Sequence, residues 1–206
     1  IGKGIAFDGR FGPRKLVYAD YVASGRALEQ VERFIMNEVL PFYANSHTEA
    51  SHCGGVMTRM REDARKIILN KCHGDSATHA VIFAGSGATL GLNKLVHLLG
   101  IRAAVAEGRP AHILVGPYEH HSNLLPWRES GAEVIEIAEC ASGGPDPVHL
   151  QQVLDGLPQG GLVVGAFSAA SNVTGIGADI PGITRIVKQA GGKVVWDYAG
   201  GGPYLP

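Results

Sequence analysis

The sequence predicts an α/β protein in which a mostly parallel sheet is flanked by helices. From about residue 79 onwards, short apolar runs rich in β-branched residues alternate with stretches whose apolar residues recur at helical spacing. This alternation is typical of βαβ units, which build parallel sheets. Glycine contributes 29 of the 206 residues, well above its usual share of about 7%, and so indicates many tight turns between strands and helices.

The first part of the chain is less regular. Residues 1–14 are rich in glycine and show no periodicity, so we expect an N-terminal arm there. A short strand is expected at 15–20. Helices are expected from about 27 to 40, where Pro41 ends the pattern, and from about 56 to 71.

The remaining elements alternate regularly along the chain. The expected strands are 79–84, 111–115, 133–137, 162–167 and 193–197. The expected helices are about 88–99, 122–129, 148–157 and 183–190. No internal repeat and no linker separates these elements, so residues 15–206 are expected to belong to one domain.

Composition excludes several classes of function. The net charge of −1 provides no basic field for nucleic acid, and no run of about 18 apolar residues is present to span a membrane. The three cysteines are widely spaced and form no CxxC motif, which favours free thiols in a reducing, cytoplasmic compartment. The chain begins with Ile1, so we expect it to start inside a longer protein.

Four polar or glycine-rich loops follow the expected strands. Because the carboxyl ends of parallel strands meet at one edge of a sheet, these loops are expected to lie together, where α/β proteins bind ligands. They read GSGAT at 85–89, YEHHSN at 118–123, SAASNVTG at 168–175 and DYAGGG at 197–202.

The first loop suits a phosphate group. Gly85–Thr89 opens a helix, and free backbone N–H groups, a hydroxyl at the helix start and the positive end of the helix dipole make an anion site. The same residues also suit a plain helix cap. The loop is not a P-loop, and it fails the dinucleotide fingerprint because Leu90 stands where a small residue belongs.

The other loops offer side chains for a flat ligand. The imidazole of His120 or His121 can stack on a ring or exchange a proton, although both also suit a polar loop. No motif gathers three metal ligands, so no metal site is expected. Asn172 can bind a ligand oxygen or simply make a turn.

Asp197 ends an apolar strand, where a carboxylate needs either a cap or a cationic partner. A protonated ring nitrogen would be such a partner. A phosphate cradle, a stacking ring, an oxygen donor and this acid together describe pyridoxal 5′-phosphate, or PLP.

The same motifs resemble those of the class V aminotransferase family, fold type I enzymes that include the cysteine desulfurases. Residues 18–24 are similar to the family's YLDNAAS segment, 86–89 match its SGAT, and 119–127 are close to its EHHAN..PW. Residues 171–175 are similar to SNVLG. The resemblance implies an aspartate aminotransferase-like fold, of which 15–206 would be the incomplete PLP-binding large domain.

The resemblance also implies roles for single residues. Ala88 and Thr89 would hold the phosphate, His120 would stack on the pyridine ring, and Asn172 would lie near the ring oxygen and the substrate. Asp197 would contact the pyridine nitrogen. The family's active site is shared between two subunits, so a homodimer is implied for the whole protein.

Two departures from the family pattern stand out. Gly200 occupies a position where relatives place a glutamine or histidine that bonds the ring's phenolic oxygen. The family's lysine that carries the cofactor is expected beyond Pro206. Lys193 shares a strand face with Asp197 but lies about 13 Å back along the strand.

The sequence therefore predicts the N-terminal part of a PLP-dependent enzyme that acts on an amino acid, as a transaminase or a cysteine desulfurase or lyase. This portion alone is expected to be inactive. Two alternatives remain open: a non-catalytic remnant of the fold that binds a partner or a phosphate ligand, and a nucleotide-binding α/β domain.

Overall fold

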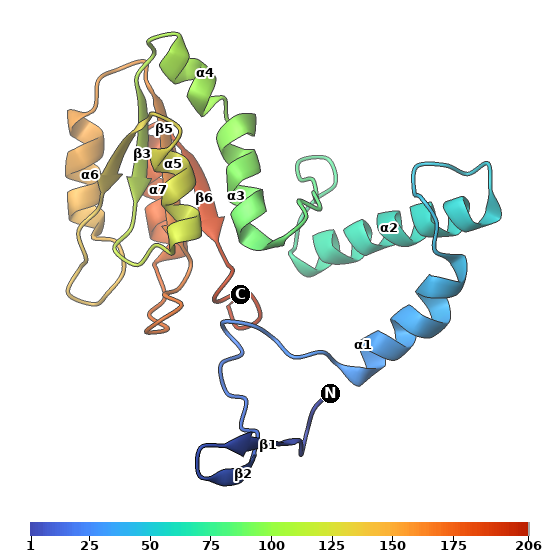
Figure 1. The fold of residues 1–206 in the computed structure, drawn as a ribbon. Coiled ribbons are helices and arrows are strands. Elements are labelled where there is room, and N and C mark those ends of the chain that lie inside the picture. The colour runs from blue at the N-terminus through green and yellow to red at the C-terminus, as the bar shows by residue number, and fades with distance from the viewer. Residues whose placement is uncertain (206) are drawn as a thin grey trace. The chain divides into compact units, whose positions relative to one another are not determined.

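A computed structural model describes residues 1–205 and separates them into two compact units (Figure 1). Unit 1 comprises Ile1–Phe83, and unit 2 begins at Ala84. Each unit is described by itself below.

Unit 2 contains a four-stranded parallel sheet, which confirms the predicted α/β fold class. The strand order is β4-β3-β5-β6. The strands are β3 (Ala111–Val115), β4 (Glu133–Glu136), β5 (Leu162–Ser168) and β6 (Lys193–Asp197). β3 lies at the centre of the apolar core, and all five of its residues are buried, as expected for a strand covered on both faces.

Helices cover both faces of this sheet. They are α3 (Gly87–Leu98), α4 (Ile101–Ala106), α5 (Leu125–Arg128), α6 (Pro147–Gly156) and α7 (Ile180–Gln189). Side chains alternate along a strand, so Ile113 packs with residues of α3, α4 and α5, whereas Leu114 packs with residues of α6 and α7. The two core clusters are therefore the two sides of one sheet.

Most of the predicted elements in unit 2 are present with ends shifted by a few residues. Two larger differences lie near the start of this unit. Residues 79–84, of which all but Ala84 belong to unit 1, were expected as a strand but have no regular secondary structure, because no described strand pairs with them and a strand requires a neighbour. Helix α4 was not predicted; Gly100, with φ of +70°, ends α3 and allows a second helix to begin at once.

Unit 1 departs further from the expectations. Residues 1–14 are not a plain arm, because β1 (Ala6–Gly9) and β2 (Gly12–Lys15) form an antiparallel hairpin. The expected strand at 15–20 is wrong, since only Lys15 of that range is in a strand. Glycine and proline in the hairpin hid the strand pattern.

The helices of unit 1 also differ in detail. α1 (Glu29–Phe34) continues as a π-helical turn, Ile35–Val39, and a 3₁₀ turn, Leu40–Phe42. The α-helix does not continue through Pro41, because proline lacks a backbone N–H and its ring clashes with the preceding turn. α2 (His52–Lys71) begins earlier than expected, at Ser51, whose hydroxyl accepts a hydrogen bond from the Gly54 amide at 3.1 Å.

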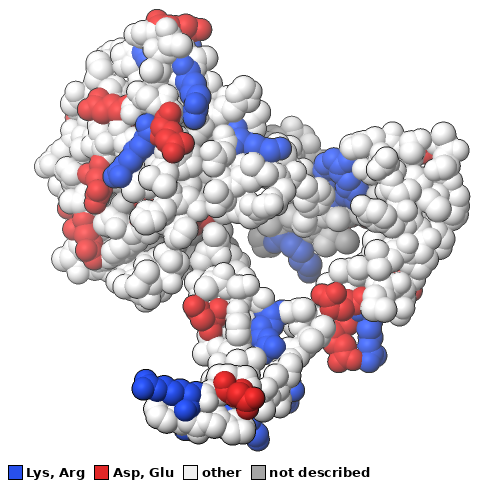
Figure 2. Space-filling model, viewed as in Figure 1, with Lys and Arg blue, Asp and Glu red and all other residues white. Residues whose placement is uncertain are grey.

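The two units bury very different amounts of apolar surface. Both core clusters lie in unit 2, whereas in the described part of unit 1 only Gly54, Gly55 and Met57 are buried. None of the helices in residues 1–205 has the length and apolar character needed to cross a bilayer. On the face seen in Figure 2, acidic and basic side chains are interspersed, without a continuous basic surface.

We predict that Leu114→Ala lowers the free energy of unfolding by about 2–5 kcal/mol, because it removes a fully buried side chain from the core. Denaturant unfolding followed by tryptophan fluorescence checks this, since both tryptophans lie in unit 2. The matched control is Leu98→Ala, whose side chain is 64% exposed and whose loss should cost less than about 0.5 kcal/mol. Equal losses in the two variants would contradict the assignment of the core.

Candidate active site

Three of the four expected loops follow β3, β5 and β6 at the carboxyl edge of the sheet, and the fourth, Gly85–Thr89, opens α3 at the same end of unit 2 (Figure 1). In Figure 1 the arrowheads of β3 and β6 point to the end of the sheet at which α3 begins. Ser168, the last residue of β5, is the register partner of Asp197, the last residue of β6. The ends of these two strands therefore lie side by side.

The start of α3 leaves amide groups free. Gly85 and Gly87 have φ values of +104° and +66°, which glycine adopts at little cost. Ser86, the N-cap, makes no side-chain cap hydrogen bond, and the N–H groups of Ala88 and Thr89 have no partner within residues 1–205. Such amides, with the positive end of the helix dipole, suit an anion.

His120 lies in the loop after β3 and is joined to α3 through Ser122. Its Nδ1 atom accepts a hydrogen bond from the Ser122 amide at 3.2 Å and lies 3.0 Å from the Ser122 hydroxyl oxygen. That oxygen lies 2.8 Å from Oγ1 of Thr89. The structure thus connects two of the predicted site residues, and the ring of His120 is exposed.

Asn172 and Gly200 come from different loops and touch each other. A Cβ atom added at Gly200 would lie 3.3 Å from Cβ and 3.4 Å from Cα of Asn172, which is tighter than ordinary contact. The absence of a side chain at residue 200 therefore lets the loop after β6 pack against exposed Asn172. This is a physical reason for the glycine at that position.

Asp197 is buried but only partly satisfied. It is 8% exposed, and one carboxylate oxygen accepts a hydrogen bond from the Ala199 amide at 2.8 Å. No cationic side chain in the described chain forms an ion pair with it. A buried carboxylate is costly without a positive partner, so this position suits a ligand that carries one.

Glu119 is a second carboxylate at the same edge, half-buried, and the sequence analysis gave it no role. Its Oε1 atom accepts from the amides of Gly116 and Ser168 at 3.2 and 2.8 Å. Its Oε2 atom accepts from the Ser168 hydroxyl and the Asn123 amide at 2.7 and 2.6 Å. Glu119 therefore ties the loop that carries His120 to the end of β5, next to Asp197.

This network reaches the core through Asn123. The Asn123 side-chain oxygen accepts a hydrogen bond from the indole N–H of Trp127 at 3.0 Å, and both residues are fully buried. An acidic residue four positions after the end of a buried strand, followed by asparagine and tryptophan at a four-residue spacing, is a signal by which this network could have been found. Burial raises the pKa of Glu119, although the hydrogen bonds from Ser168, Asn123 and Gly116 oppose that shift.

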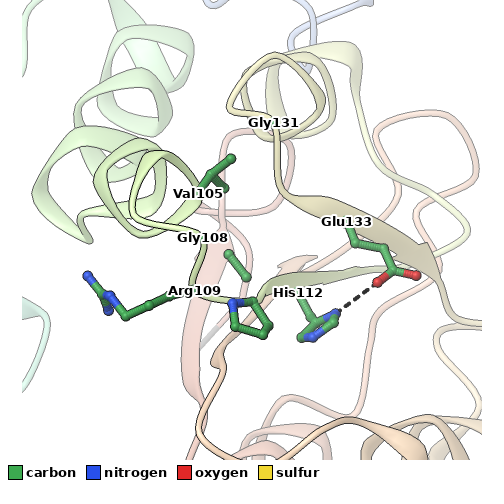
Figure 3. A pocket seen from close by; sticks show the side chains of 8 residues that line it. Val105, Gly108, Arg109, His112, Gly131 and Glu133 are labelled. Carbon is green, nitrogen blue, oxygen red and sulfur yellow. Dashed lines mark ion pairs between the residues drawn. The ribbon is translucent and has the colours of Figure 1, made fainter.

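Two cavities lie at opposite ends of the sheet. One of about 240 Å³ is lined by Thr89, Ser122, Leu125 and their neighbours, beside the start of α3. The other, of about 310 Å³, lies at the amino ends of β3 and β4, where His112 Nδ1 lies 3.1 Å from a carboxylate oxygen of Glu133 (Figure 3). Only the first borders the predicted site residues.

We predict that Glu119→Gln lowers the free energy of unfolding at pH 7 by about 1–3 kcal/mol, because an amide cannot accept all four hydrogen bonds. The raised pKa of Glu119 means that the folded chain binds the proton more tightly than the unfolded chain. The stability that comes from this tighter proton binding is fully present below the ordinary value of 4.5 and is lost as pH rises through the folded-state pKa. The difference in hydrogen bonding between the carboxylate and an amide is the part that remains at pH 7.

Denaturant unfolding measured from below pH 4.5 up to pH 7 checks both the loss of stability in Glu119→Gln and its pH dependence. The stability difference between wild type and Glu119→Gln should shrink as pH rises above 4.5. The matched control is Glu136→Gln, at an exposed position on β4. A difference that grows with pH would contradict the stated direction of the pKa shift.

Comparisons with known proteins find relatives over most of the chain. The chain is 27% identical over 194 residues to a probable cysteine desulfurase of Halalkalibacterium halodurans, covering 92% of this chain and 46% of the relative. It is 28% identical over 205 residues to a probable cysteine desulfurase of Aeropyrum pernix, covering 94% and 46% respectively. The chain thus spans about half the length of the curated relatives that it matches.

Solved structures show the same fold. A NifS-like protein from Rickettsia africae superposes with a TM-score of 0.75 at 21% identity, covering 91% of this chain and 49% of that one. An apo cysteine desulfurase from Thermococcus onnurineus has a TM-score of 0.70 at 24% identity, covering 85% and 42%. The model of the family described as aminotransferase class-V matches residues 17–204, and the chain therefore belongs to the class V aminotransferase family.

Proposed function

We propose that this chain is part of a PLP-dependent enzyme that acts on an amino acid, as a transaminase or a cysteine desulfurase or lyase. Membership of the family and the relatives named as cysteine desulfurases support this proposal. The observation that carries it is Asp197, a buried carboxylate without a cationic partner among the described residues, placed at the carboxyl end of β6.

The residues present fit the cofactor at three points. The free amides of Ala88 and Thr89, at the start of a twelve-residue helix, suit its phosphate. The exposed ring of His120 is available to stack on the pyridine. Asp197 would hold a proton on the pyridine nitrogen, because a carboxylate favours the charged form of a nearby base.

The bound cofactor would supply an electron sink for the α-carbon of the amino acid. The chain's own residues would bind and orient it. Asn172 can donate from its amide to the ring oxygen or to the substrate carboxylate. Glu119 fixes the distance between the loop of His120 and the end of β5, and so sets the position of the stacking ring relative to Asp197.

Gly200 bears on which residue contacts the phenolic oxygen of the ring. With no side chain at residue 200, the contact that the family resemblance implies for the ring's phenolic oxygen is missing there, and Asn172 occupies the adjacent space. We therefore assign that contact to Asn172. By resemblance, the whole protein is proposed to be a homodimer in a reducing, cytoplasmic compartment, in keeping with the three free cysteines of the described chain.

We predict that the chain binds PLP and that Asp197→Ala weakens binding at least about 100-fold, because it removes the charged partner of a buried ring nitrogen. His120→Ala should weaken binding about 5- to 10-fold through lost stacking. Titration followed by cofactor absorbance checks both. Asp155→Ala and His97→Ala are matched controls at exposed positions and should leave affinity unchanged.

The same titration separates the alternatives. A non-catalytic remnant that holds only a phosphate ligand would bind inorganic phosphate and PLP alike, and would be insensitive to Asp197→Ala. A nucleotide-binding domain would bind a nucleotide and not PLP. Either result would contradict the proposal.

We predict that borohydride reduction of the chain with PLP yields no stoichiometric lysine adduct at a single site, so that this portion alone is inactive. The reason is geometric: Lys193 lies at the exposed start of β6, whereas Asp197 lies at its end. Peptide mass spectrometry checks the result. A single-site adduct on Lys193 or any other lysine of residues 1–206 would show that the chain carries its own cofactor lysine.

A further inference from the structure

The hydroxyl of Ser122 joins the two residues proposed to hold opposite ends of the cofactor. Its oxygen lies 2.8 Å from Thr89 Oγ1, at the start of α3, and 3.0 Å from His120 Nδ1, in the loop after β3. Ser122 itself was not among the predicted site residues.

The direction of each hydrogen bond follows from the Ser122 amide. That N–H donates to His120 Nδ1 at 3.2 Å, so Nδ1 carries no proton, and a neutral ring must hold its proton on Nε2. The Ser122 hydroxyl can then only donate to Nδ1, because two facing lone pairs would repel. Its own lone pairs accept the Thr89 hydroxyl proton, and the chain runs from Thr89 through Ser122 to His120.

We infer that Ser122 is a positioning residue that fixes the orientation of the His120 ring and couples it to Thr89. The backbone amide already sets the tautomer, and the hydroxyl, which shares the Nδ1 lone pair with that amide, restrains the plane of the ring further. The inference rests on the proposed function for its effect on PLP, but the hydrogen-bonded chain exists without the cofactor. Ser122 is not proposed to touch the cofactor.

The direct test is ¹⁵N NMR of the histidine-labelled chain without PLP, with the His120 signal assigned by its loss in His120→Asn. In wild type, Nδ1 of His120 should show the shift of an unprotonated nitrogen. Ser122→Ala, which keeps the backbone amide as a donor, should move that signal toward the shift of an unprotonated nitrogen with a weaker hydrogen bond, and Ser122→Thr, which keeps the hydroxyl, should restore it. Ser142→Ala, at an exposed site in another loop, is the matched control.

A double-mutant cycle tests the coupling. Thr89→Val keeps the side-chain shape and removes the hydroxyl, so it should shift the His120 Nδ1 signal in wild type but not in Ser122→Ala. An equal shift in both backgrounds, or no change of the signal in Ser122→Ala, would overturn the inference.

The consequence for binding is measured separately. Ser122→Ala should weaken PLP binding about 3- to 10-fold, the effect of losing one hydrogen bond, and Ser122→Thr should restore it. If wild type binds no PLP, the proposed function fails while the NMR result still decides the role of Ser122. Unchanged PLP affinity in Ser122→Ala would contradict the positioning role.

Discussion

The candidate site depends on the carboxylate of Glu119. A parallel sheet delivers several loops to one edge but does not fix how those loops lie relative to one another. Four hydrogen bonds converge on Glu119, from Gly116, Ser168 and Asn123, and they join the end of β3 to the end of β5. Because Asn123 is held in turn by Trp127, the loop of His120 is anchored in the core.

The two carboxylates at this edge differ in how their own chain satisfies them. Half-buried Glu119 accepts four hydrogen bonds from its own chain. The side chain of buried Asp197 accepts one hydrogen bond, from the Ala199 backbone amide, and has no cationic partner in the described residues. Glu119 organises the loops, and under the proposed function Asp197 receives a positively charged ligand atom.

The sequence predicted the sheet of unit 2 well because strand composition and helical spacing are signals carried by neighbouring residues. The five buried residues of β3 and the apolar stretch that ends at Asp197 are strands by composition alone, and helical spacing marks α3, α6 and α7. Residues 79–84 have the same strand composition and yet form no strand, because strand formation depends on a partner that composition cannot supply. The hairpin β1–β2 was missed because its glycines and proline are typical of loops.

For the site, the sequence predicted which residues would gather at the edge but not what holds them. Asp197 and Ser168 meet through register, which follows from the parallel sheet. The contact between Gly200 and Asn172, the convergence on Glu119 and the bridge through Ser122 all join residues far apart in the chain. Only the three-dimensional structure shows these contacts. Glu119, Asn123 and Trp127 do follow one another at a four-residue spacing, which is a signal in the sequence itself.

The central claim is that Asp197 receives the protonated ring nitrogen of PLP at this edge. A crystal structure of the chain with bound PLP tests it most directly. The account predicts the phosphate on the amides of Ala88 and Thr89, the ring against His120, and the ring nitrogen within about 2.7–2.9 Å of an Asp197 oxygen. A cofactor bound elsewhere, or bound here with its ring nitrogen turned away from Asp197, would contradict it.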